Sequence, residues 1–384
     1  MQGGLTQADW PQIDERELTA LVRRLPQVWS APVPAARPVW HSQRPFGAAA
    51  RVAADHGEVF IKRHDPRVRD VASLREEHCF LHHLHERGFA ATRVLADPGG
   101  ESAFAIGAWT YEVHQIAPGV DAYRDAVSWT NVRCPAHARA LGRALAQLHQ
   151  ASAGFVAPER APRPLLAGVA IIGAQDLAEA LRRFVAAHPQ IGQFLDGQGT
   201  NWHQQILDAC AGTHEQLRGL IPALMPLWVH NDLHASNAFW TDRSELAQVR
   251  AVIDFGLCNL GWAMSDLATA LERNTIAWLE LEESGGEGAG AIGRIALALA
   301  LIDGYCELRT PSPEERRALP LLLELAHLEY SLSEVEYFHG IVANDVHARL
   351  AYPKFLLGHV RWFGSRAGRE YLAAVRQRLL GAPA

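Results

Sequence analysis

The polar run His230-Asn231-Asp232-Leu233-His234-Ala235-Ser236-Asn237 interrupts a helix-rich half of the chain, and Ile253-Asp254-Phe255-Gly256 follows it one strand later. Short apolar runs beside both segments predict a hairpin of strands. The carboxylates of Asp232 and Asp254 and the amide of Asn237 are therefore expected at strand ends. Oxygen ligands of this kind suit Mg²⁺, which shares its coordination sphere with phosphates. The pattern indicates phosphoryl transfer.

A cation for the phosphates is predicted in the first third of the chain. Phosphoryl transfer requires a metal ion, a carboxylate beside the acceptor hydroxyl and a cation on the phosphates that are not transferred. Alternating apolar residues around a Gly-containing turn predict a β-hairpin over 48–62 that ends at Lys62. The spacing that follows predicts an amphipathic helix over 70–87, which carries Glu76 and Glu77. Lys62 is thus the candidate cation.

In these features the chain resembles the aminoglycoside phosphotransferase and choline kinase group, relatives of the protein kinases. The resemblance covers roughly residues 40–270. It rests on the order of strand lysine, helix glutamate and hinge, and on four motifs: H-x-D-x-x-x-x-N over 230–237, Ile253-Asp254-Phe255-Gly256, Ser265-Asp266-Leu267-Ala268 and the helix over 141–149. It implies an α+β, bilobal, protein-kinase-like fold, with a small β-sheet lobe that has one helix and a larger, mainly helical lobe.

The pattern of helix, turn and strand signals along the chain indicates three segments, and the resemblance implies the roles of the second and the third. Residues 1–40 form an N-terminal extension, with a helix over 15–25 and a Pro-rich connector over 31–38. Residues 41–117 form the nucleotide-binding lobe. Residues 118–384 form the catalytic and acceptor-binding lobe.

The resemblance also implies a role for each motif residue. Asp232 is the catalytic carboxylate, which orients the acceptor hydroxyl and takes its proton. Asn237 and Asp254 hold Mg²⁺ against the phosphates of ATP. Lys62 pairs with the α- and β-phosphates and is fixed by Glu77, with Glu76 as the fallback.

Other residues support or contact these groups. His230 is expected to form structural hydrogen bonds under the catalytic loop, and Asp266 to brace that loop. The segment 111–116, with Glu112 and His114, is expected to be the hinge whose backbone binds adenine.

Two positions depart from the pattern of this group. Asn231 stands where Gly is usual, and Asn is the non-Gly residue that best tolerates left-handed backbone angles. The loop over 42–50, expected over the phosphates, has the single glycine Gly47. A Gly-rich array of backbone N–H groups, which phosphates prefer, cannot be placed there.

Alternatives remain open at this point. The segment 76–80 and the overall order also resemble bacterial Ser/Thr protein kinases of this fold. The glycine-poor loop suggests a catalytically silent nucleotide-binding module. A zinc-dependent hydrolase is a weaker alternative, based on His230-x-Asp232-x-His234 and on the i, i+4 pair His78 and His82.

The acceptor is not determined by the motifs. Aminoglycosides, amino alcohols, homoserine and sugar-like alcohols all have kinases in this group. Between Trp262 and Asp345 there are fifteen acidic residues and five arginines, with aromatic residues between them. This composition can form an acidic, aromatic-lined cleft for a cationic acceptor or merely solvated helix faces.

Composition excludes several classes of partner. The chain has 384 residues, 48% of them hydrophobic, and 36 Lys and Arg against 42 Asp and Glu give a net charge of −6. Such a field attracts neither nucleic acid nor an anionic membrane. Five scattered cysteines without a C-x-x-C pair argue against a disulfide framework and favour a cytoplasmic setting. The expected partner is a small-molecule hydroxyl acceptor, and the oligomeric state is left open.

Overall fold

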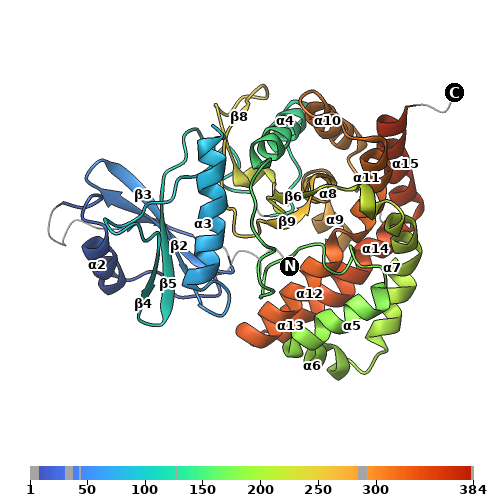
Figure 1. Ribbon diagram of the computed structural model, residues 1–384, viewed down its shortest axis with the longest axis horizontal. Coiled ribbons are helices and arrows are strands. Elements are labelled where there is room, and N and C mark those ends of the chain that lie inside the picture. The colour runs from blue at the N-terminus through green and yellow to red at the C-terminus, as the bar shows by residue number, and fades with distance from the viewer. Residues whose placement is uncertain (1–7, 31–37, 43–44, 127, 284–291, 382–384) are drawn as a thin grey trace. The chain divides into compact units, whose positions relative to one another are not determined.

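Two compact units make up the chain. The computed structural model describes residues 8–30, 38–42, 45–126, 128–283 and 292–381 (Figure 1). The first unit comprises Met1–Pro118 with Ala251–Gly256, and the second comprises Gly119–Arg250 with Leu257–Ala384. The expected Pro-rich connector lies outside the described residues except at its last position.

The first unit contains an antiparallel five-stranded sheet in the order β1-β2-β3-β5-β4. Its strands are β1 (Pro38–His41), β2 (Ala48–Ala54), β3 (Gly57–His64), β4 (Ala103–Ile106) and β5 (Trp109–Gln115). Two helices, α2 (Glu15–Arg24) and α3 (Val71–Glu86), belong to the same unit. Gly57 closes the β2–β3 turn with a φ of 118°, which glycine adopts without strain.

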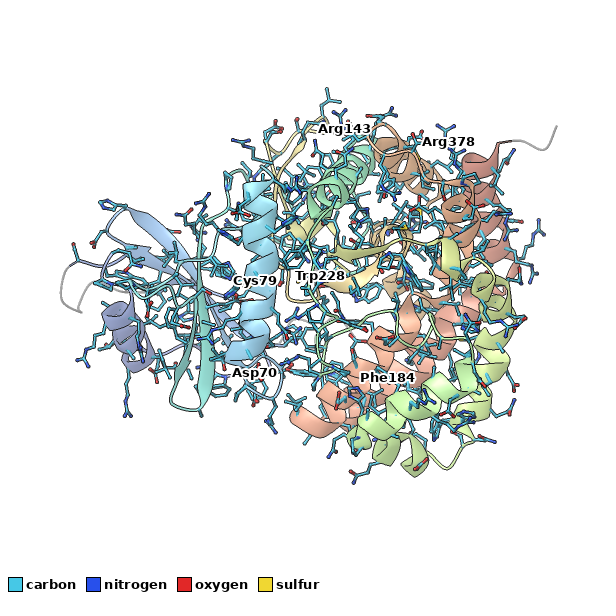
Figure 2. All side chains as sticks on the ribbon, in the orientation of Figure 1. Asp70, Cys79, Arg143, Phe184, Trp228 and Arg378 are labelled. Carbon is cyan, nitrogen blue, oxygen red and sulfur yellow. The ribbon has the colours of Figure 1, made fainter. Side chains whose placement is uncertain are left out.

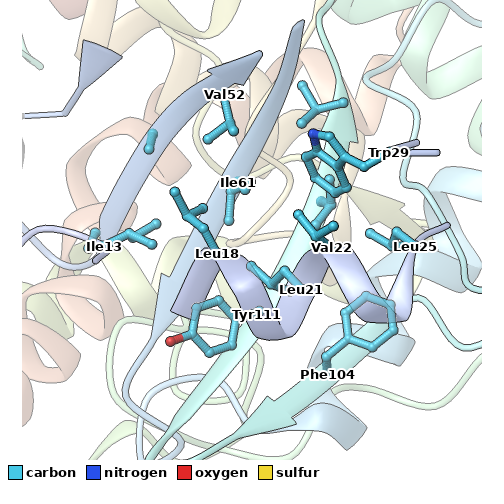
Figure 3. Packing of buried hydrophobic residues seen from close by; sticks show 14 residues of the cluster. Ile13, Leu18, Leu21, Val22, Leu25, Trp29, Val52, Ile61, Phe104 and Tyr111 are labelled. Carbon is cyan, nitrogen blue, oxygen red and sulfur yellow. The ribbon is translucent and has the colours of Figure 1, made fainter. Parts of the chain in front are cut away.

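Helix α2 is part of the core of the first unit and not a separate extension. Its buried residues Leu18 and Leu21 form one cluster with Val52, Ile61 and other residues of the sheet (Figure 3). Successive strand residues point to opposite faces. Ile61 therefore faces α2, and its neighbours along β3 face the other side of the sheet.

Helix α3 supplies the histidine that meets this second face. Asp70, labelled at the start of the helix in Figure 2, accepts a hydrogen bond of 2.7 Å from the backbone N–H of Ser73 and caps it. The His78 ring of α3 lies 2.9 Å from the carboxylate of Glu112 on β5. The polar residues of the second face are thus enclosed between strands and helix.

The second unit is mainly helical. Its helices are α4 (Pro135–Ser152), α5 (Leu177–Ala187), α6 (Pro189–Gly197), α7 (Trp202–Arg218), α8 (Ala263–Thr275), α9 (Trp278–Glu283), α10 (Ile295–Cys306), α11 (Pro313–Leu325), α12 (His327–Val335), α13 (Asp345–Arg349), α14 (Leu357–Phe363) and α15 (Arg366–Leu380). The 3₁₀ turns are η1 (Ile221–Ala223) and η2 (Ala235–Asn237), and the π-helical segments are η3 (Glu336–Ile341) and η4 (Leu350–Leu356). None of the helices in the described part of the chain is long and apolar enough to cross a membrane.

Short strands carry the central polar loop. Strand β6 (Pro226–Val229) pairs with β9 (Asn259–Trp262), and β7 (Ala238–Trp240) pairs with β8 (Val249–Val252), whose last residues belong to the first unit. Trp228 of β6 is buried and anchors the first strand (Figure 2). The α+β fold with one small β-sheet part and one larger helical part is confirmed.

Candidate active site

The loop after β6 places Asp232 through the backbone of the two residues before it. Asn231 has a φ of 60°, in the left-handed region that asparagine tolerates. Its side-chain amide donates to the backbone carbonyls of Leu257 at 3.2 Å and Ala167 at 3.4 Å. The loop therefore forms with asparagine at the position where glycine is usual.

Asp266, at the start of α8, holds this loop from below. Its fully buried carboxylate accepts hydrogen bonds from the backbone N–H of His230 at 2.8 Å and of Asn231 at 2.9 Å. His149 Nε2 lies 3.1 Å from the same carboxylate. Burial raises the pKa of Asp266, but the hydrogen bond and charge of His149 and the nearby His230 outweigh it, so the net pKa is lowered. An ionised carboxylate thus braces the loop.

His149 was not assigned a role from the sequence. It lies near the end of α4, and its Nδ1 is 2.8 Å from the Tyr305 hydroxyl of α10. The two contacts of its ring connect α10 to Asp266. The sequence signal was only its place at the end of the 141–149 motif.

Asp232 lies in a set of polar contacts within the second unit. Its backbone N–H donates to His230 Nδ1 at 3.2 Å, so His230 supports the loop. Asn237 donates its amide N–H groups to the carbonyl of Asp232 at 2.9 Å and to its Oδ2 at 3.2 Å. Arg273 Nη1 lies 3.2 Å from Asp232 Oδ1. The Asp232 side chain keeps 15% exposure, which leaves it reachable by an acceptor.

Lys62 meets Asp254 within the first unit. Its Nζ donates to Asp254 Oδ1 at 2.8 Å and lies 3.9 Å from Glu112 Oε1. Burial lowers the pKa of the Lys62 ammonium, but the charges of Asp254, Glu112 and Glu77 outweigh burial and raise it overall. Lys62 is therefore a fixed, permanently charged cation.

Glu112 is the centre of a buried polar cluster that the sequence did not predict. Its carboxylate lies 3.1 Å from His64 Nε2, 2.9 Å from His78 Nε2 and 2.9 Å from His114 Nε2. Burial raises its pKa, but the charges of His114 and Lys62 and two histidine hydrogen bonds lower it well below the usual value.

The predicted pairing of Lys62 with Glu77 is not direct. Glu77 is 1% exposed, and its Oε1 has no hydrogen-bond partner among the described residues. Strand pairing explains the difference, because the β3–β5 register sets Lys62 directly opposite Glu112. Glu77 acts on Lys62 through its charge alone.

The predicted hinge also differs in the structure. Residues 111–115 run inside the sheet, with β3 on one side and β4 followed by residues 93–95 on the other. Their backbone groups are occupied by sheet hydrogen bonds, and the Glu112 and His114 side chains are buried. These residues therefore do not offer the backbone contact to adenine that the sequence suggested.

Asp254 is held by its backbone and its neighbours. It has a φ of 62°, an uncommon value for a residue other than glycine, and its side chain is 48% exposed. Phe255 packs edge-to-face on Phe80 of α3, with ring centres 6.1 Å apart. The Gly256 carbonyl accepts a hydrogen bond of 2.9 Å from Arg69. These contacts present the carboxylate of Asp254 to solvent and to Lys62.

The loop between β1 and β2 has no glycine array. A Cβ on Gly47 would lie 3.3 Å from the carbonyl oxygen of Arg63, so this glycine permits a close approach to β3. Residues 43 and 44, at the centre of the expected phosphate loop, lie outside the described residues.

The histidines suggested as zinc ligands do not form a metal site. His230 Nδ1 accepts from a backbone N–H, and His234 Nδ1 lies 2.9 Å from the Ser236 hydroxyl. Within the described ranges, the group spaced to hold a metal ion is a different one, Glu272, His327 and His359.

Comparisons with known proteins give a consistent result. The sequence model of the phosphotransferase enzyme family (APH) matches residues 42–319. A homoserine kinase of Xanthobacter autotrophicus is 28% identical over 256 residues, which is 66% of this chain and 66% of that protein. A microcompartment-associated aminopropanol kinase has a similar fold, with a TM-score of 0.61, 16% identity and coverage of 95% of this chain and 100% of the other. An amicoumacin kinase bound to AMP-PNP and Ca²⁺ has a TM-score of 0.54, 14% identity and coverage of 97% and 95%.

Proposed function

The chain belongs to the phosphotransferase enzyme family, which its residues 42–319 match, and from this premise we propose that it transfers the γ-phosphoryl group of ATP to a hydroxyl group of a small molecule. The predicted family and enzyme class are thereby confirmed, and the donor and acceptor are proposals. The observation that carries them is the position of Asp232, a partly exposed carboxylate on a loop held by buried Asp266.

The chemistry that we assign to Asp232 is general-base catalysis. Its carboxylate accepts a hydrogen bond from the acceptor hydroxyl and takes its proton as the hydroxyl oxygen forms a bond to the γ-phosphorus. The bond from that phosphorus to the bridging oxygen of ATP breaks, and ADP leaves with the electron pair. Positioning supplies most of the acceleration in such reactions. The hydrogen bonds from Asn237 fix the orientation of Asp232 for this task.

The residues present fit a magnesium nucleotide. Asn237 turns its amide nitrogen toward Asp232, which leaves its oxygen as the donor atom, and Asp254 offers an exposed carboxylate. Both are oxygen ligands, as Mg²⁺ prefers. We assign Asn237 and Asp254 as metal ligands and Lys62 as the cation for the non-transferred phosphates. A bound Mg²⁺ would neutralise charge on the phosphates.

The test is a transfer assay with a panel of acceptors. Purified protein, ATP and Mg²⁺ are incubated with alcohols, amino alcohols, hydroxy amino acids, sugars and aminoglycosides, and ADP and the phosphorylated product are measured. We expect acceptor-dependent ADP release that falls by about 10²- to 10⁴-fold in Asp232→Asn. Asp242→Asn, at an exposed turn of the same unit, is the matched control and should keep full activity.

Three results would contradict the proposal. Full activity of Asp232→Asn would remove the assigned base. Phosphorylation of peptides in place of small molecules would favour the protein kinase alternative. Binding of ATP without transfer to any acceptor would favour a silent nucleotide-binding module.

A further inference from the structure

Arg273 lies beside Asp232 near the end of α8. Its Nη1 is 3.2 Å from Asp232 Oδ1, and the residue is 4% exposed. The guanidinium carbon lies 4.2 Å from the ring centre of Trp129 and 4.9 Å from that of Tyr330. Ring contacts of this kind use the faces of a guanidinium and leave the N–H groups in its plane for an anion. Arg273 is thus held beside the carboxylate that we assign as the base.

The protein does not use all the donors of Arg273. Among the described residues, its buried Nε has no hydrogen-bond partner. A cavity of about 30 Å³ is lined by Arg273, by Asn231 of the catalytic loop and by Tyr330. That volume holds one or two water molecules, which the charged end of a ligand would displace. A guanidinium with unused in-plane donors binds a carboxylate best, because the two groups match in geometry.

Glu334 supplies a group of opposite charge that the Tyr330 hydroxyl engages only in part. It follows Tyr330 by four residues on α12, so both side chains lie on one face of that helix, and it is 4% exposed. In the described part of the chain its Oε2 has no hydrogen-bond partner. Burial raises the pKa of Glu334 to about 7, while the charges of His327 and Arg273 oppose this rise. A cation beside Glu334 would favour its ionised form.

Two neighbouring carboxylates are already engaged. Glu272 Oε1 lies 3.0 Å from His327 Nδ1 and 3.1 Å from His359 Nδ1. Glu329 accepts two backbone N–H groups, at 2.7 and 3.2 Å. Of these three buried acids, Glu334 is the one with a buried oxygen that lacks a hydrogen-bond partner among the described residues.

We propose that Arg273 binds the carboxylate and Glu334 the ammonium group of a zwitterionic acceptor, a hydroxy amino acid whose hydroxyl reaches Asp232. This inference rests on the proposed function and selects among its acceptors. An amino alcohol or an aminoglycoside would bring positive charge beside Arg273 without giving its N–H groups a partner. The carboxylate of an amino acid instead takes over the contact of Arg273 with Asp232, which releases an Asp232 oxygen for the hydroxyl.

Three acceptors with the same hydroxyl arm test this assignment. Homoserine carries both charged groups, 3-aminopropan-1-ol lacks the carboxylate, and 4-hydroxybutyrate lacks the ammonium. The value of kcat/KM is measured for each by ADP release. We expect the wild type to prefer homoserine over either analogue by about 10- to 100-fold, the usual effect of one charged hydrogen-bonding group. A preference for 3-aminopropan-1-ol or for an aminoglycoside would overturn the proposal.

Two variants separate the two charged contacts. Arg273→Met should lower the preference for homoserine over 3-aminopropan-1-ol at least 10-fold, and Glu334→Gln should do the same for homoserine over 4-hydroxybutyrate. Arg273→Lys keeps the charge but not the planar fork, and it should lose part of the preference if Arg273→Met fails to fold. Arg309→Met, at an arginine stacked on Tyr305, is the matched control for Arg273→Met. Glu324→Gln, at a glutamate bound by Thr213, is the matched control for Glu334→Gln. Both controls should leave the preference for homoserine unchanged.

The two proposals fail in different ways. Transfer to some hydroxyl with preferences unchanged in Arg273→Met and Glu334→Gln would overturn the acceptor assignment and leave the proposed function intact. Absence of transfer to every acceptor would overturn the proposed function itself.

Discussion

Single charged residues in the first unit are placed by strand register as much as by motif. Lys62 was predicted from its position before a glutamate-bearing helix, and the structure pairs it with Asp254 at 2.8 Å. Glu112 could not be predicted as its neighbour, because only the pairing of β3 with β5 sets the two opposite each other. Pairing between strands distant in the chain is decided by the packing of the whole sheet.

A second case at this scale is Glu329, a buried carboxyl group with no ion pair among the described residues. Burial raises the pKa of Glu329 to about 7, against which the N–H groups of Ile171 and Gly168 act. The folded state therefore binds a proton more tightly than the unfolded state, whose glutamate titrates near 4.5. The stability that this proton contributes is complete below pH 4.5 and is lost as the pH rises to about 7.

We therefore expect Glu329→Gln to become more stable relative to wild type as the pH rises. Between pH 5 and pH 8 the difference in the free energy of unfolding should change by roughly 2–3 kcal/mol in favour of the variant. Urea unfolding at both pH values measures it. The exposed Glu245→Gln should show no such trend, and parallel pH profiles of Glu329→Gln and wild type would show that the buried carboxyl is not protonated in the folded protein.

Among the elements, those with strong local signals were predictable. The hairpin of β2 and β3 follows from alternation and a Gly turn, and helix α3 follows from its amphipathic spacing. The roles of Arg273 and His149 were not predictable, since both depend on which residues from distant helices surround them. Asp266 was found from its motif, and its buried bonds to the loop explain why an aspartate stands there.

Helices α4 and α10 make a close backbone contact that could not be predicted from the sequence. A Cβ on Gly142 would lie 2.0 Å from the Leu301 carbonyl oxygen, and one on Gly304 would lie 2.0 Å from the Arg139 carbonyl oxygen. The two helices thus touch backbone to backbone at two glycines, one on each helix. Gly142 belongs to the motif helix that also carries His149, so this crossing positions the brace of Asp266.

Accordingly, Gly142→Ala and Gly304→Ala should each destabilise the protein by about 1–3 kcal/mol or more, since an added methyl must push the helices apart. Gly212→Ala, on α7 with no atom within 4 Å of its Cβ position, is the control and should stabilise by about 0.5–1 kcal/mol. Chemical unfolding measures all three. Equal stability of Gly304→Ala and wild type would contradict the close helix crossing.

At the scale of the whole molecule, chain order and structural unit do not coincide. The first 118 residues form one unit, yet Ala251–Gly256 belongs to it as well. The backbone N–H of Thr92 donates to the carbonyl of Val252 at 3.0 Å, which ties this returning segment to the first unit. Asp254 thereby joins Lys62 although 192 residues separate them in sequence. The motif order alone predicted the roles of these residues but not this division.

Nucleotide binding can be measured on the entire chain as an increase in its thermal stability. A ligand that binds only the folded protein stabilises it by about 2.7 kcal/mol at 100 times its Kd, which for a chain of this size is a shift in Tm of roughly 3–5 °C. We expect ATP with Mg²⁺ to produce such a shift, and EDTA to abolish it. Asp254→Asn should lose the metal-dependent shift, because a neutral amide binds Mg²⁺ less well than a carboxylate, whereas Asp232→Asn should keep it. An ATP shift that EDTA abolishes but Asp254→Asn leaves unchanged would mean that residues other than Asp254 hold the metal, and a shift that EDTA leaves unchanged would mean that ATP binds without the metal.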